Sequence, residues 1–159
     1  ERMSVVYALG RNPCPSAVEK LVSLLKTDDN AYVRRATAWS LANYDNQIVL
    51  KPLINALKND VAAVRLWSSS SLAEIGNVSS KNAELAAEQL LISLKIDNES
   101  GVRSNCIWSL CRLFEKLDNT FQECFVDECT KIALFDKEPS VMEEAKTALD
   151  SMGMQGFYN

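Results

Sequence analysis

The sequence predicts an all-α fold, a right-handed α-α superhelix (α-solenoid) of about four helix pairs. The first observation is a recurring segment that begins with Val-Arg and ends on leucine, at Val33–Leu41, Val64–Leu72 and Val102–Leu110. A weaker copy spans Val141–Leu149, and Glu1–Gly10 matches the end of another. The leucines recur every 31 to 39 residues, a period typical of stacked helical repeats. The second observation is composition, because 47% hydrophobic residues with 5 glycines and 4 prolines suit helices better than a turn-rich β fold.

In this prediction each pair has a first helix, the A helix, and a second helix, the B helix. Residues 1–9 form the B helix of an incomplete first pair, which Gly10 should end. The next helix continues to about residue 26, and Ser16 is expected to cap it, with Glu19 completing a capping box. The polar residues 27–30 then turn the chain into the B helix 31–42.

The remaining helices alternate with turns rich in Asp, Asn and Gly. We expect them over residues 47–58, 59–75, 82–96, 102–117, 120–135 and 140–152. Pro52 lies inside the first of these, where a proline costs roughly 3 kcal/mol. The last B helix carries Glu143, Glu144 and Lys146 and is more polar than its predecessors, which is typical of a terminal repeat.

These elements belong to a single repeat domain over residues 1–159. Its repeat cores should end near residues 10, 42, 76, 117 and 152, followed by a loose tail over residues 153–159. Within that tail, Phe157 and Tyr158 are the side chains available to fold back. The chain begins at Glu1, without methionine and inside a repeat, so we expect it to be a piece of a longer protein.

Charge and composition argue against several classes of function. The net charge of −4 provides no general attraction to nucleic acid or to an anionic membrane. No apolar run is long enough to span a membrane. There is no histidine, which removes the commonest general base and metal ligand. The 5 cysteines are an odd number in helical patterns, which favours reduced, packed thiols and a cytoplasmic location.

The repeat pattern resembles a known family. The segments 29–41 and 60–72, each with an Asp-bearing turn followed by Val-Arg, small residues and leucine, resemble the HEAT repeat. More narrowly, they are similar to the short HEAT-like repeats of the phycobilisome lyase class of cyanobacteria. The resemblance covers nearly the whole chain, although Ala42, Ala73 and Cys111 stand where that class usually has glycine. It implies a solenoid whose B helices line a concave groove.

A helical wheel separates a core face of the B helix from an outer face. At about 100° per residue, Thr37 and Leu41 lie within about 80° of Val33 and define the core face. Trp39 lies near 240°, almost opposite. The resemblance therefore implies that Trp39 faces the concave groove.

Large aromatic residues recur on this outer face. Tyr7 and Trp108 have the position of Trp39 in their own copies, and Trp67 lies on the flank of the same face. Rigid aromatic side chains at such places are typical binding anchors. The alternative is that the rings pack between neighbouring B helices. On the binding interpretation, the residues of the partner-binding groove are Tyr7, Arg35, Trp39, Leu66, Trp67, Ser70, Ser104, Asn105 and Trp108.

Three arginines, Arg34, Arg65 and Arg103, repeat in the same position of their copies. Each is expected to reach the acidic side chains or carbonyls of the turns in an adjacent repeat, such as Asp60 or Asp97, and so to form a structural ladder. The alternative is an anion-binding role. The serine run 68–71 similarly favours close helix packing over chemistry.

The cysteines do not form a recognisable metal motif. Cys106 and Cys111, and again Cys124 and Cys129, are spaced by five residues, about 140° apart on a helix, which is a poor geometry for binding one metal. We interpret them as small packed side chains. No phosphate-binding glycine loop or catalytic triad pattern is visible, so no catalytic or metal-binding residue is predicted.

Two classes of function remain open at this stage. The first is a non-catalytic scaffold that binds another protein, such as a phycobiliprotein subunit or a second HEAT-like subunit, with no cofactor. The second, implied by the resemblance, is a subunit of a bilin lyase that attaches or detaches a linear tetrapyrrole. A role beside iron–sulfur assembly is a lesser alternative. Neither nucleic acid nor membrane is an expected partner.

The helix phase makes a testable prediction. Leu41→Ala and Leu72→Ala should each cost about 2–5 kcal/mol in the free energy of unfolding, because both leucines should be buried in the core. Urea denaturation of the two variants measures this cost. A change below about 0.5 kcal/mol at both positions would show that the helix phase is wrong.

Overall fold

The computed structural model describes residues 1–154, apart from the side chain of Asn46. All regular structure in this range is helical. The α-helices are α1 (Arg2–Arg11), α2 (Val18–Thr27), α3 (Ala31–Ser40), α4 (Asn46–Asn59), α5 (Ala62–Gly76), α6 (Ser80–Ile96), α7 (Ser100–Leu113), α8 (Asn119–Phe135) and α9 (Pro139–Ser151). Short 3₁₀ helices add η1 (Pro15–Ala17), η2 (Leu41–Asn43) and η3 (Phe114–Lys116). The predicted all-α solenoid is confirmed.

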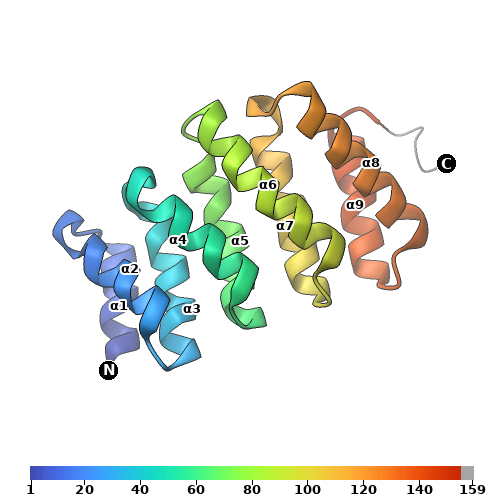
Figure 1. The fold of residues 1–159 in the computed structure, drawn as a ribbon. Helices are drawn as coiled ribbons and strands as arrows, with labels where there is room; N and C mark the ends of the chain where they lie inside the picture. Colours follow the sequence, from blue (N-terminus) through green and yellow to red (C-terminus); the bar gives the residue numbers. More distant parts are fainter. Residues whose placement is uncertain (155–159) are drawn as a thin grey trace.

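The helices form two layers that run from one end of the molecule to the other (Figure 1). The A layer contains α2, α4, α6 and α8, and the B layer contains α1, α3, α5, α7 and α9. Four complete pairs therefore follow α1, a B helix that has no A helix of its own among the described residues. Neighbouring B helices pack on each other more extensively than neighbouring A helices do, so the B layer is the inner, concave side of the stack.

The predicted core face is buried. Val33, Thr37 and Leu41 are each less than 4% exposed, and Leu72 is fully buried as well. The apolar face of each B helix in a complete pair meets the A helix of that pair, and neighbouring B helices pack on one another, so the core runs as one continuous cluster along the stack. This is how a helix pair that cannot bury its apolar face alone becomes stable.

Gly10 and Ser16 do not have the roles at helix ends that the sequence predicted for them. Gly10 does not end α1, which continues to Arg11; Gly10 is buried where α1 meets α3, and a Cβ there would collide with the Trp39 ring. Ser16 does not cap α2, because the 3₁₀ helix η1 precedes it and α2 begins only at Val18. The Ser16 hydroxyl lies 3.2 Å from Cys14 Sγ instead.

The end of α9 is a glycine cap. Gly153 has φ of 75°, a conformation that L side chains rarely adopt, and the Met154 amide donates to the carbonyl of Leu149 over 2.8 Å. This is the bond of a Schellman cap. The rest of the predicted tail, with Phe157 and Tyr158, lies outside the described residues.

The predicted arginine ladder is confirmed, and it has one more rung than expected. Each ladder arginine, at the start of a B helix, binds the carboxylate in the turn of the next pair. The rungs are Arg2–Asp28 (3.0 Å), Arg34–Asp60 (2.9 Å), Arg65–Asp97 (2.8 Å) and Arg103–Asp136 (2.9 Å). The hydrogen bonds that Arg65 donates to the Asp97 carboxylate, with the negative charge of that group, raise the pKa of Arg65 above its ordinary value. Met142 occupies the equivalent position of α9 and cannot form a rung.

The same arginines also hold the turn of their own pair. Nη1 of Arg34 donates to the carbonyl of Asp28, Nη1 of Arg65 to that of Asp60, and Nη1 of Arg103 to that of Asp97, all within 2.9 Å. One planar guanidinium thus joins two consecutive turns, a geometry that a lysine cannot reproduce. The ladder fixes how far each pair is shifted against the next.

A second ladder of serines joins the B helices. Ser40 Oγ donates to the carbonyl of Val6, Ser71 to that of Ala38, and Ser109 to that of Ser69, over 2.6 to 2.7 Å. All three serines are buried and stand seven residues after the Val of their repeat. Small hydroxyl side chains let the helices approach closely and satisfy the donor at the contact. The interpretation of the serine run 68–71 as close packing is confirmed.

The arginine ladder yields a prediction. Arg65→Met, which copies the residue found naturally at position 142, should lower the free energy of unfolding by about 3 kcal/mol, because the nearly buried Asp97 carboxylate loses its partner. Denaturant unfolding measures the loss. The matched control is Arg112→Met, whose ion pair with Glu74 is about half exposed on both sides and should contribute less than about 1 kcal/mol. Equal losses in the two variants would contradict the ladder.

Candidate binding surface on the inner side of the stack

The first two aromatic residues of the predicted groove pack between helices. The ring centroids of Tyr7 and Trp39 lie 5.5 Å apart at a tilt of 58°. Both side chains are half-buried, and the Trp39 ring also lies against Gly10. These contacts join α1 to α3, so Tyr7 and Trp39 pack between neighbouring B helices, as the alternative interpretation predicts.

Trp67 and Trp108 behave differently. Their exposed fractions are 37% and 42%, which is unusual for such large apolar side chains. The guanidinium carbon of Arg112 lies 5.1 Å from the centroid of the Trp108 ring, and the same arginine binds Glu74 over 2.9 Å. Trp108 is therefore held in place by its own helix α7 while one side of it stays open to solvent.

The polar residues of the predicted groove link α5 to α7. Asn105 Nδ2 donates to the Leu66 carbonyl over 3.1 Å and to Ser70 Oγ over 2.7 Å. Leu66, Ser70 and Ser104 are each half-buried. Because Asn105 already uses its donors inside the protein, these residues form the support beside the two exposed tryptophans.

Arg35 forms a cation–π contact with Tyr32, which was not among the predicted groove residues. Its guanidinium carbon lies 5.2 Å from the ring centroid of Tyr32, whose side chain is 63% exposed. A signal was available, since Tyr32 precedes Trp39 by seven residues and lies within about 20° of it on the wheel. Glu74 follows Trp67 by seven residues and therefore lies on the same side of α5.

We define the inner aromatic surface as the exposed and half-exposed residues of these contacts: Tyr32, Arg35, Trp67, Glu74, Trp108 and Arg112. It comes from three consecutive B helices, α3, α5 and α7. Its chemistry suits apolar side chains, with cationic and anionic groups at the margins. It contains no nucleophile beside a general base.

The cysteines divide into two groups. Cys106 and Cys129 are buried, and loss of hydration raises the pKa of both thiols far above the ordinary value. Burial also raises the pKa of the half-buried Cys111 to about 11. Cys14 and Cys124 are exposed, so the prediction of packed thiols is wrong for these two. Cys14 stands between Pro13 and Pro15, which keep it outside a helix.

No group of three or more His, Cys, Asp or Glu side chains in residues 1–154 is arranged to hold a metal ion. In the same range, none of the helices combines the length and the apolar character that crossing a membrane requires.

The geometry defines a class of protein, an α-solenoid scaffold that offers a continuous inner surface, a fold suited to binding other proteins. The family model for HEAT repeats matches residues 2–73 and 18–111, and the chain belongs to the HEAT-repeat family. A search of curated proteins found no match. Among solved structures, the chain is similar to the designed armadillo repeat protein YIII(Dq.V1)4CPAF in complex with the peptide (KR)4. That likeness has a TM-score of 0.64 and 17% identity, and it covers 98% of this chain and 81% of that one.

The thiol environments can be tested directly. In the native protein, a thiol reagent at pH 8 should modify Cys14 and Cys124 quickly and the other three cysteines only after unfolding. With a pKa of about 11, Cys111 has only about one thiolate in a thousand at that pH. Absorbance of the released chromophore counts the thiols in each phase. The variant Cys14→Ser/Cys124→Ser should lose the fast phase, and fast labelling of Cys106 or Cys129 would contradict the described packing.

Proposed function

We propose that this protein is a non-catalytic scaffold that binds a partner protein along the inner aromatic surface. The observation that carries the proposal is the exposure of Trp67 and Trp108 on adjacent B helices of a tightly connected stack. Exposed tryptophans are the side chains most enriched at energetically important positions of protein interfaces. A partner segment that covers both rings removes a large apolar area from water at one place.

The support below these rings favours binding with little loss of entropy. Asn105 and the serine ladder tie α5 to α7, and Arg112 lies against the Trp108 ring. Side chains that are already held in place lose less conformational freedom on association, so more of the contact energy contributes to affinity. The designed armadillo repeat protein, which is in complex with a peptide, supports a polypeptide as the class of ligand.

Narrower versions of this function come from the resemblance to phycobilisome lyase repeats. The partner would then be a phycobiliprotein subunit or a second HEAT-like subunit, and a bilin would lie on the tryptophans. Bilin attachment, or iron–sulfur assembly, would give this protein a cofactor. Both versions rank behind the scaffold, because the exposed aromatic rings require only an apolar partner surface. Co-expression with a bilin, and anaerobic reconstitution with iron, would reveal them as visible absorbance bands.

The test uses peptides selected from a displayed random library on the immobilised 159-residue chain. Trp67→Ala and Trp108→Ala should each weaken the Kd of the selected peptides at least about tenfold, measured by calorimetry, while the melting temperature stays within about 2 °C. The matched control is Ile92→Ala on α6, an apolar side chain of similar exposure, 44%, in the A layer. It should leave the Kd unchanged.

Trp39→Ala separates binding from packing. Because this ring fills the contact between α1 and α3, its removal should lower the melting temperature by more than about 5 °C. Peptides that bind the Trp67→Ala/Trp108→Ala double variant as tightly as the unaltered chain would show that the inner aromatic surface is not the binding surface.

A further inference from the structure

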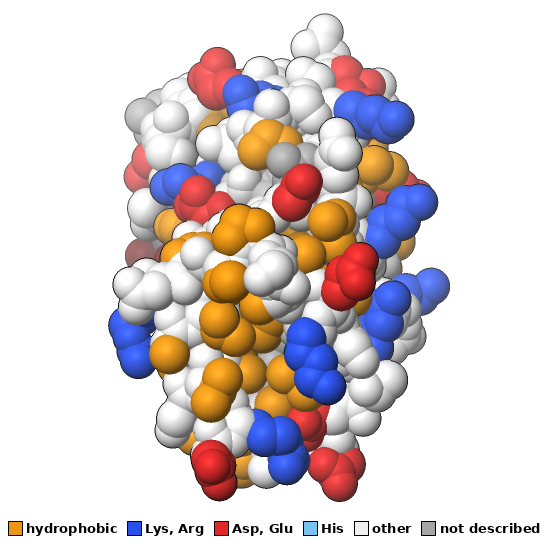
Figure 2. Space-filling view, turned by 90° about the vertical axis from the view of Figure 1, so that its left-hand side faces the viewer, with side chains coloured by type: hydrophobic (Ala, Val, Ile, Leu, Met, Phe, Trp, Pro, Cys, Tyr) orange, Lys and Arg blue, Asp and Glu red, His pale blue; other side chains and the backbone are white. Residues whose placement is uncertain are grey.

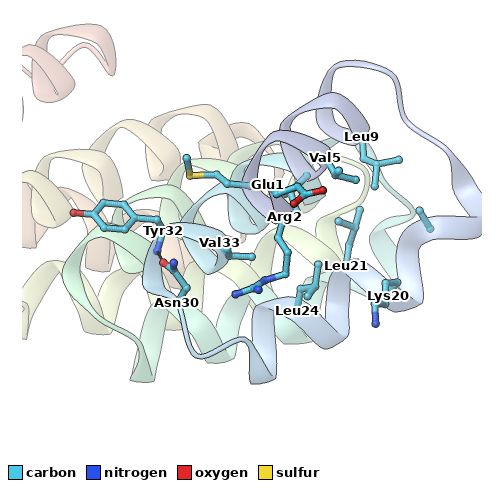
Figure 3. Close-up of a pocket in the computed structure, with 13 residues that line it drawn as sticks. Glu1, Arg2, Val5, Leu9, Lys20, Leu21, Leu24, Asn30, Tyr32 and Val33 are labelled. Atoms are coloured by element: carbon cyan, nitrogen blue, oxygen red, sulfur yellow. Dashed lines mark hydrogen bonds between the residues drawn. The ribbon is translucent and has the colours of Figure 1, made fainter.

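The N-terminal end of the stack contains an apolar hollow, which meets the inner aromatic surface only at Tyr32. Figure 2 looks onto this end and shows hydrophobic side chains gathered there. The hollow has a volume of about 690 Å³ and lies between α1, α2 and the beginning of α3 (Figure 3). Its apolar lining includes Val5, Leu9, Leu21, Leu24 and Val33.

A comparison with the equivalent residues of the later repeats shows that some of these side chains are less buried than expected. Val5 is 57% exposed, whereas the residues at the same position of the next three B helices, Thr37, Ser68 and Cys106, are fully buried. Leu9 is half-buried, whereas its equivalents are fully buried: Leu41, Leu72 and Leu110. Val6 also lines the hollow but is only 1% exposed, and its carbonyl accepts a hydrogen bond from Ser40 of α3. The deficit is therefore on the side of α1 that faces the A layer.

In the complete pairs, the cover is the A helix. Helix α4 packs on its partner α5 and on the next A helix α6, and α2 packs in the same way on α3 and α4. The hollow is bounded by α1 and by α2, the two helices that an A helix preceding α1 would contact. Because α1 is already a B helix, a single helix fills this position.

Arg2 provides an independent observation. Its Nε binds Asp28 over 3.0 Å, as the other ladder arginines bind their next turn. The other three donate from Nη1 to the carbonyl of the turn that precedes their own B helix. Among the hydrogen bonds of the described residues, Nη1 of Arg2 makes none, and the side chain is 59% exposed beside the hollow.

We propose that the hollow is the docking site of one amphipathic helix, supplied by polypeptide outside residues 1–159. This helix ends in a turn whose backbone carbonyl accepts a hydrogen bond from Nη1 of Arg2. The apolar face of the helix covers Val5 and Leu9 on one side and Leu24 on the other. The hollow shares only Tyr32 with the inner aromatic surface, and the inference uses none of the other residues of that surface.

A second copy of the chain fits the hollow less well. Its C-terminal end presents α8 already paired with α9. If α8 entered the hollow, α9 would have to lie where α1 lies. If α9 packed beside α1 as a preceding B helix, the hollow itself would stay empty. Because α1 already occupies the B position at this end, the hollow fits one helix and not a helix pair.

The test places a copy of this protein's own A helix in the hollow. Residues 46–63 are fused directly before Glu1, so that the copied Asp60 precedes Arg2 by five residues, as Asp60 precedes Arg65. The melting temperature should rise by at least about 5 °C, because an added helix completes a repeat interface. Hydrogen exchange of α1, followed by mass spectrometry, should slow by at least about tenfold.

Two matched variants make the test specific. In the first, the fused copy carries Leu53→Asp and Leu57→Asp, which remove its apolar face and should abolish both gains. In the second, Arg2→Met should lower the melting temperature of the fused chain by more than it lowers that of the 159-residue chain. Equal stabilisation by the intact and the Asp-bearing copies would overturn the proposal. So would an unchanged melting temperature, or sedimentation of the 159-residue chain as a dimer with α1 protected.

Discussion

The stack depends on one contact, the bond of a B-helix arginine with the aspartate of the next turn. Arg34 and Arg65 each join two consecutive turns, since Nε and Nη2 bind the next carboxylate while Nη1 binds the carbonyl of their own turn. A charge-assisted contact of this kind has little freedom of direction. It fixes the shift between helix pairs, and with it the leucines that meet in the core and the carbonyls that the serines reach.

The ladders also explain why the inner side is a surface suited to recognition. Ser71 and Ser109 bring the B helices close together. A large side chain at the edge of such a helix therefore either packs into the contact between helices or extends into solvent. Trp39 enters the contact between helices because Gly10 leaves space for it. Trp67 and Trp108 meet no such glycine and remain partly in solvent. Tryptophan thus fills a contact between helices at position 39 and stays partly exposed, available to a partner, at positions 67 and 108.

The two ends of the stack differ in the same terms. At the first B helix, the ladder arginine Arg2 is present and binds Asp28, yet its Nη1 group and the apolar side chain of Val5 face an open hollow. At the last B helix, Met142 replaces the ladder arginine, while both α1 and α9 have alanine, Ala8 and Ala148, at the serine position. The first B helix therefore has the arginine that joins one repeat to the next, and the last B helix does not.

The sequence by itself determined the fold class, the helix phase and the arginine ladder, because each depends on spacing that repeats along the chain. Val33, Thr37 and Leu41 follow the helical period, and an arginine at a constant position must meet the turn at a constant position. Only the tertiary structure decided the exposure of each aromatic side chain. Tyr7, Trp39 and Trp108 share one position on the wheel, but whether a ring is covered depends on the neighbouring helix, which offers Gly10 to Trp39 and leaves Trp108 open. That distinction arises between residues far apart in the chain, where the helical period carries no information.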